Sequence, residues 1–310
     1  MQRTLKERYL NLFTDFGFKK LFGTEFNKPL LIDFLNELIG KEVGKIEKLT
    51  FLPTEQLPIG QSDRRAIFDI YCESDRGEKF IVEMQKARQN YFKDRSVYYS
   101  TFPIQQQAEK GNWNFKLKAV YTIGILDFVF DENKNDQNTF HHEVKLFDTK
   151  TDKVFFDKLT YIYLEMPKFT KTEDELETHF EKWLFVLKNL HLLTTRPPKL
   201  QERIFKNIFE TTDLKQLSDK EYQAYEESLK HYRDLKNSLD TAFDEGKIEG
   251  EQIGLQKGEQ IGLQKGKIEG EKLKAIKTAK KLIKMGLSIE QIATATDLPA
   301  EQIIKIKKEL

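Results

Sequence analysis

The sequence predicts an α+β (α/β) fold in which a mixed β-sheet is flanked by helices and followed by an all-helical C-terminal region. Three changes of pattern along the chain predict it. Apolar residues recur at helical spacing up to about residue 40, with a period of two from about 46 to 166, and at helical spacing again after Pro167.

The composition is that of a folded chain with no strong charge bias. Charged residues make up 33% of the 310 residues, but the formal net charge is only +1. Any affinity for nucleic acid must therefore come from local patches. Cys72 is the single cysteine, which excludes an intramolecular disulfide. We find no apolar run of membrane-span length and no signal-peptide pattern, so we expect a cytoplasmic protein without a membrane segment.

The N-terminal helical segment covers residues 1 to about 40, where Gly40 is the predicted stop. The strands that we expect share a two-residue alternation and cover 46–52, 67–73, 79–85, 116–128, 141–147 and 154–166. A polar and aromatic helix at 88–111 interrupts them, and Pro103 should kink or split it.

Capping signals organise the C-terminal part. Thr172 with Glu175, and Ser218 with Glu221, are capping boxes, and the second predicts a helix that runs toward Leu239. We expect a core domain at 1–170, a helical accessory region at 171–240, a glycine-repeat segment at 241–286 and a small tail at 287–310.

The glycine-repeat segment has a glycine at every fourth position, at Gly246, Gly250, Gly254, Gly258, Gly262, Gly266 and Gly270. Each glycine inside a helix costs about 1 kcal/mol relative to alanine. Either the segment is a flexible spacer, or close approach of two helices recovers the loss. The i, i+4 stripe suits a right-handed crossing between two copies, so we expect a homodimer formed through this region.

Two short helices are expected at 287–309, with Ser288 capping the first and Pro299 in the first turn of the second. One interpretation is a minimal helix-turn-helix whose lysines contact phosphates. The other is a small dimerising or capping hairpin with solvated lysines.

The alternation on either side of residues 74–78 predicts a β-hairpin with a defined register. The apolar residues of one face are Phe68, Ile70 and Cys72 on the first strand and Phe80, Val82 and Met84 on the second. A three-residue loop, 75–77, with Gly77 left-handed, pairs 68 with 84, 70 with 82 and 72 with 80. A slip by one residue would set apolar residues opposite charges.

This register places Asp69 opposite Glu83 on the other face, with Gln85 alongside. Directly opposed side chains have Cβ atoms about 5 Å apart, where two carboxylates repel each other unless a cation lies between them. A hard cation such as Mg²⁺ accepts these oxygen ligands. The alternative is a pair of acids on a solvated face.

These residues resemble a known family. Asp69-Ile70-Tyr71 followed by Val82-Glu83-Met84-Gln85 resembles the Asp…Glu-X-Lys core of the PD-(D/E)XK nucleases, and in particular the recombination-promoting nuclease (transposase) branch, in which Glu-Met-Gln is usual. The stretches 15–22, 35–38, 95–99, 106–111 and 117–126 resemble further landmarks of that branch. The resemblance covers residues 10 to 170, and the glycine repeat is also typical.

The resemblance implies a restriction-endonuclease-like core and a metal-dependent DNA endonuclease that is linked to recombination or mobile elements. It implies that Asp69 and Glu83 are ligands of Mg²⁺, or of Mn²⁺ or Ca²⁺, together with the Met84 carbonyl. Gln85 stands where most of the superfamily has a lysine, and it cannot supply a positive charge. Supporting carboxylates are expected at Asp15 or Glu37, and phosphate contacts at Lys19, Lys86, Arg88 and Arg95.

Alternative interpretations stay open at this point. A Glu-X-Lys sequence also occurs at Glu143–Lys145, and a hairpin would set Glu143 opposite Asp127. The five histidines show no zinc-ligand spacing. The absence of a lysine at Gln85 leaves room for a nucleic-acid-binding or oligomerisation module with little or no turnover, or for an adaptor whose helical tail is the functional part.

Overall fold

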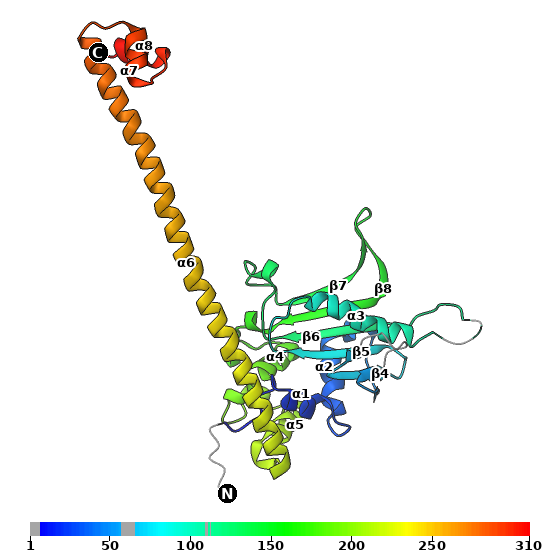
Figure 1. Ribbon diagram of the computed structural model, residues 1–310. Helices are drawn as coiled ribbons and strands as arrows, with labels where there is room; N and C mark the ends of the chain where they lie inside the picture. Colours follow the sequence, from blue (N-terminus) through cyan, green and yellow to red (C-terminus); the bar gives the residue numbers. More distant parts are fainter. Residues whose placement is uncertain (1–6, 57–65, 109–110, 112) are drawn as a thin grey trace. The chain divides into compact units, whose positions relative to one another are not determined.

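The computed structural model describes residues 7–56, 66–108, 111 and 113–310 (Figure 1). The chain forms two compact units, Met1–Ser238 and Leu239–Leu310. Helix α6 (Asp219–Lys284) begins in the first and ends in the second. In the described part of the chain, no helix combines the length and apolar character that crossing a membrane requires.

The first unit is built on a mixed six-stranded sheet with the order β1-β4-β5-β6-β8-β7. Its strands, in that order, are β1 (Leu49–Phe51), β4 (Ile70–Ser74), β5 (Lys79–Gln85), β6 (Val120–Leu126), β8 (Lys153–Glu165) and β7 (His141–Asp148). The central strands β5, β6 and β8 are parallel, and the outer strands pair antiparallel. A separate short pair consists of β2 (Glu55–Gln56) and β3 (Ala66–Ile67). The predicted fold class, a mixed sheet flanked by helices, is confirmed.

Helices cover both faces of this sheet (Figure 1). The even-numbered side chains of β5 face a large core that is covered by α1 (Asp15–Phe22), α2 (Lys28–Val43), α4 (His179–Asn189) and α5 (Arg203–Thr212). On the opposite face, Ile81 lies in a smaller cluster with Tyr99 and Phe102 of α3 (Phe92–Gln105). The strand alternation therefore buries both faces, each against a different set of helices.

The N-terminal helix prediction was partly wrong. Residues 7–14 are not helical, and Tyr9 instead forms a β-bridge with Asp213. Gly40 lies within α2, and the helix ends before Gly44, whose φ of 77° is open to glycine and strained for other residues. Residues 1–6 lie outside the described residues.

The helix predicted at 88–111 is shorter than expected. It begins at Phe92 and ends at Gln105, and Pro103 lies inside its last turn. Proline has no main-chain N–H to donate to the preceding turn, and the helix ends two residues after it. The expected stop, Gly111, follows residues 109–110, which lie outside the described part.

The capping signals have mixed outcomes. Thr172 and Glu175 cap only a single 3₁₀ turn, and α4 begins at a second box formed by Thr178 and Glu181. Ser218 does begin α6, because its main-chain N–H and hydroxyl donate to Glu221 at 2.9 and 2.8 Å.

Helix α6 does not end near Leu239, as the sequence suggested, but continues through all seven glycines to Lys284. The physical reason is that no proline interrupts 219–284, and the glycines alternate with good helix formers such as lysine, glutamate, glutamine and leucine.

In the second unit, the end of α6 packs with α7 (Ile289–Thr296) and α8 (Ala300–Lys308). Ala279, Ile292 and Ile303 form the centre of this small core. Ser288 caps α7, as predicted, and Pro299 is the N-cap of α8. The four-part division of the chain stays a prediction.

Candidate active site

The β4–β5 hairpin has the predicted register. Ile70 pairs with Val82, Tyr71 with Ile81 and Cys72 with Phe80. The turn closes with the Ser74 N–H donating to the Glu78 carbonyl at 2.9 Å, and Gly77 has a φ of 88°. Burial of the face that carries Ile70, Cys72, Phe80 and Val82 explains why this register is selected.

The predicted pairing of Phe68 with Met84 was wrong. Strand β4 begins only at Ile70, and the chain bends at Asp69. The Phe68 N–H donates to the Thr54 carbonyl at 2.9 Å, and its ring packs edge-on against Tyr71 on the α3 face of the sheet. The bend therefore turns Phe68 to the face opposite Met84 and leaves Asp69 at the start of the strand.

Asp69 and Glu83 are brought together by reciprocal hydrogen bonds. The Met84 N–H donates to Asp69 Oδ2 at 2.9 Å, and the Asp69 N–H donates to Glu83 Oε1 at 3.1 Å. Each carboxylate is thus held by the main chain of the other segment. The two acids face one another across the end of the hairpin.

Burial raises the pKa of Asp69 and is the largest influence on it. Burial, followed by the negative charge of Asp69, raises the pKa of Glu83 to about 8. The positive charge of Lys19 lowers the pKa of both acids. Two desolvated carboxylates whose negative charges repel each other favour either a shared proton or a bound cation.

Gln85 lies two residues after Glu83 on β5, so both side chains leave the same face of the strand. It is 8% exposed, and its Nε2 donates to the Ala87 carbonyl at 2.9 Å. Its Oε1 accepts a hydrogen bond from Arg95 Nη2 at 2.5 Å. A guanidinium group therefore reaches the position at which Gln85 lacks a charge.

Arg95 is positioned by α3. Its guanidinium carbon lies 5.4 Å from the ring centre of Phe92 and 5.6 Å from that of Tyr99, and it donates to the Gln89 side chain. Its charge lowers the pKa of Glu83, against the effect of burial. The sequence suggested Arg95 only as a phosphate contact; its i−3 and i+4 aromatic neighbours were the signal that this cation is held in one place.

The remaining predicted residues divide into two groups. Asp15 forms an ion pair with Lys19 at 2.9 Å. The negative charge of Asp15 raises the pKa of Asp69, and the positive charges of Lys19 and Lys86 lower it. By contrast, Glu37 is exposed on α2 and its charge acts on His179, so the structure does not bring it to the acid pair. Arg88 forms an ion pair with Asp131.

The alternative pairing of Asp127 with Glu143 was wrong. Strand β8 lies between β6 and β7, so no hairpin joins these two acids, and Glu143 is paired with Ile162. Asp127 instead accepts a hydrogen bond from the Tyr232 hydroxyl at 2.8 Å. The hairpin that does form joins β7 to β8, the two strands that follow one another in the sequence.

The donor set of the acid pair fits a hard divalent cation. The Met84 N–H donates to Asp69. The N–H and C=O groups of one strand residue point to the same side of the strand, so the Met84 carbonyl also points to the side on which Asp69 lies. Within the described ranges, no three or more His, Cys, Asp or Glu side chains gather as a metal site. Two carboxylates and a carbonyl suit Mg²⁺, which keeps several waters.

Comparison with known proteins adds one finding. A model of the family described as "PD-(D/E)XK nuclease family transposase" matches residues 12–242, which include the whole sheet and the acid pair. No curated protein and no solved structure matches the chain.

Proposed function

Because the chain belongs to the PD-(D/E)XK nuclease family transposases, we propose that it is a metal-dependent DNA endonuclease linked to recombination or mobile-element activity. The observation that carries the proposal is the reciprocal pair, in which the Glu83 carboxylate accepts a hydrogen bond from the Asp69 N–H and the Asp69 carboxylate accepts one from the N–H of Met84, the residue after Glu83. A buried pair of acids costs stability, which is expected of a site selected for chemistry rather than for packing.

In this proposal, Asp69, Glu83 and the Met84 carbonyl hold Mg²⁺, or Mn²⁺ or Ca²⁺ in its place. A bound divalent cation supplies Lewis acidity, which lowers the pKa of the attacking water and offsets charge on the phosphate. Asp69 and Glu83 contribute by keeping their carboxylates converged before the substrate arrives, and this preorganisation avoids reorganisation during the reaction.

Gln85 and Arg95 share the task that one lysine performs in most of the superfamily. The Gln85 carboxamide orients the guanidinium through the 2.5 Å hydrogen bond from Arg95 Nη2. Arg95 supplies the positive charge that balances the phosphate as the bond to the leaving oxygen breaks. Lys19 and Lys86, whose charges lower the pKa of Asp69, are the proposed contacts to flanking phosphates.

We propose further that the protein acts as a homodimer joined through the glycine segment of α6. Ile253 is 43% exposed and Leu263 is 76% exposed in the single chain, although both belong to its repeated motif. Apart from the adjoining backbone of α6 itself, no atom of the described residues lies within 4 Å of a Cβ built at Gly254 or Gly262, so the backbone is open to a second helix. Cytoplasmic location suits the one, buried cysteine, Cys72.

Plasmid nicking with and without Mg²⁺ tests the proposed chemistry. We expect the wild type to convert supercoiled to open-circular DNA only with the metal. Asp69→Asn should lose more than about 100-fold of this activity, because one of the two carboxylate ligands is gone. Asp127→Asn is the matched control, since Asp127 is also buried in part but bonds to Tyr232, and it should nick like the wild type.

Three results would contradict the proposal. Equal loss in both variants would point to a general folding defect, and loss in Asp127→Asn alone would move the site. Gel shifts without nicking in the wild type would favour a binding module in place of an enzyme.

A further inference from the structure

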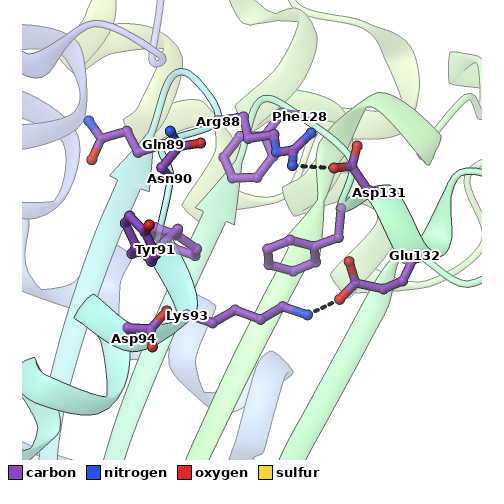
Figure 2. A pocket seen from close by; sticks show the side chains of 11 residues that line it. Arg88, Gln89, Asn90, Tyr91, Lys93, Asp94, Phe128, Asp131 and Glu132 are labelled. Carbon is purple, nitrogen blue, oxygen red and sulfur yellow. Dashed lines mark hydrogen bonds and ion pairs between the residues drawn. The ribbon is translucent and has the colours of Figure 1, made fainter.

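A cavity of about 540 Å³ opens at the carboxyl ends of β5 and β6 (Figure 2). It is lined by segment 88–94, which follows β5, and by segment 128–132, which follows β6. In sheets with parallel strands, ligands bind at the carboxyl ends of those strands. The volume lies within the roughly 300–1,000 Å³ that small-molecule sites occupy.

This cavity is connected to the acid pair through Arg95. Gln89, in its wall, accepts a hydrogen bond from Arg95, and the same guanidinium donates to Gln85. Arg95 therefore lies between the wall of the cavity and the residues that we assign to catalysis. A group bound in the cavity would be separated by Arg95 from a phosphate at Asp69 and Glu83.

Aromatic rings line the cavity from both segments, Tyr91 on the segment after β5 and Phe128 on the segment after β6 (Figure 2). Tyr91 is 79% exposed and has a φ of 62°, in the left-handed region. Strained backbone of this kind persists mainly where function requires it. Phe128 is half-buried and packs edge-on against Phe130, with ring centres 5.7 Å apart.

Two cations cross the same space. Arg88 forms an ion pair with Asp131, and Lys93 forms one with Glu132, so each pair joins one segment to the other (Figure 2). The four side chains are between 44% and 56% exposed, and ion pairs this exposed are weak. A phosphate offers the same oxygen acceptors with more charge and can displace them.

We propose that this cavity binds one unpaired nucleotide of DNA beside the bond that is cut. Its base stacks between Tyr91 and Phe128, and its phosphates replace Asp131 and Glu132 on Arg88 and Lys93. A base inside a duplex has both faces covered by its neighbours, so only an unpaired or flipped base can present a face to the rings. The inference rests on the proposed nuclease function and names the form of DNA that the enzyme takes.

Fluorescence anisotropy with a labelled single strand of about twelve nucleotides tests the inference on the full-length protein, in EDTA so that no cleavage takes part. We expect Tyr91→Ala and Phe128→Ala each to weaken binding about 10-fold, the usual loss when a stacking ring is removed. Tyr91→Phe, which keeps the ring, should bind like the wild type. The double variant Asp131→Asn, Glu132→Gln should bind the strand more tightly, because it frees both cations.

The inference is overturned if the alanine variants bind the single strand like the wild type, or if they weaken a perfect duplex of the same sequence by the same factor. Its failure is distinguishable from failure of the proposed function. Binding that depends on the two rings, without plasmid nicking, would exclude the nuclease function and support the nucleotide site in the cavity. Nicking together with binding that does not depend on the rings would support the nuclease function and exclude the nucleotide site.

Discussion

The β4–β5 hairpin and the glycine segment of α6 both carry regular sequence patterns, but they satisfy them differently. In the hairpin, Ile70, Cys72, Phe80 and Val82 are at most 1% exposed, so the apolar pattern is buried within the chain. In α6, Leu255 and Leu263 are 68% and 76% exposed. A buried pattern selects one register and thereby places the polar residues of the other face. From the exposed pattern we propose a contact with a second chain.

In the hairpin, the largest effect that we expect is on the nicking rate, through the positive charge that Arg95 brings to Gln85. We expect Arg95→Gln to reduce metal-dependent nicking about 100-fold, the typical loss when one preorganised charge-stabilising group is removed. Arg95→Lys should lie between, because it keeps the charge but loses the fork that reaches Gln85 and Gln89. Initial nicking rates measure both.

Two further variants sharpen this prediction. Arg76→Gln is the matched control, since Arg76 contacts the carbonyls of Gly44 and Lys45 near the turn of the same hairpin, and it should retain activity. Adding Gln85→Lys to Arg95→Gln should restore part of the rate by returning a charge to the site. Wild-type rates in Arg95→Gln would exclude the assigned role.

The next largest effect is on the pH dependence of stability without metal. The pKa of Glu83 is about 8 in the folded protein, against an ordinary value near 4.5. Between these values the folded state keeps a proton that the unfolded state has lost, so the free energy of unfolding falls as pH rises. Below this window the penalty is absent, and above it the penalty is complete.

Melting temperatures measured across this window, with Mg²⁺ and with EDTA, check the expectation. If Mg²⁺ binds at Asp69 and Glu83 as proposed, it binds their ionised form, so it should raise the melting temperature most at the alkaline end. Glu83→Gln should flatten the pH dependence in EDTA and abolish the response to Mg²⁺. Glu73→Gln, an acid of the same hairpin that pairs with Lys79 at 3.3 Å, should keep both. An unchanged pH slope in Glu83→Gln would rule out the assignment.

In the glycine segment of α6, replacing glycines by alanine should have opposite effects on the stability of an isolated helix and on that of a dimer. Gly254→Ala with Gly262→Ala should stabilise an isolated helix by about 1 kcal/mol each, since no atom of the described chain obstructs the added Cβ. If glycines face a partner helix, the same change weakens the dimer. Sedimentation equilibrium measures the dimer, and Gln256→Ala with Gln264→Ala, at equivalent repeat positions, is the control. A dimer unaffected by the glycine changes contradicts self-association through this stripe.

The smallest effect concerns Tyr91, an exposed side chain on strained backbone. Tyr91→Gly should relieve the left-handed φ of 62° and raise the free energy of unfolding by about 1 kcal/mol or less, because glycine adopts that region without a Cβ clash. Chemical denaturation measures it. Tyr91→Phe keeps the strain and should unfold like the wild type; a loss of stability in Tyr91→Gly would mean that the ring serves packing instead of binding.

The same contrast explains what the sequence could predict. Alternation predicted the register of the hairpin, the left-handed Gly77 and the meeting of Asp69 with Glu83, because burial of one face leaves a single alignment. It missed the bend at Asp69, since that depends on Phe68 bonding to Thr54 and packing against α3, contacts between segments that local pattern does not encode.

Other features depended on tertiary placement in the same way. The hydrogen bond between Arg95 and Gln85 requires α3 to lie over β5, and the position of β8 beside β6 separates Asp127 from Glu143. The length of α6 was underestimated because each glycine was weighed as a local cost, although no proline or unfavourable neighbour stops the helix.

The most direct test of the account is the position of Mn²⁺ in crystals of the full-length protein, located by its anomalous scattering. We expect one peak bound by carboxylate oxygens of both Asp69 and Glu83 and by the Met84 carbonyl, and no peak in Asp69→Asn crystals. A peak bound elsewhere, or Asp69 and Glu83 turned away from a bound ion, would contradict it.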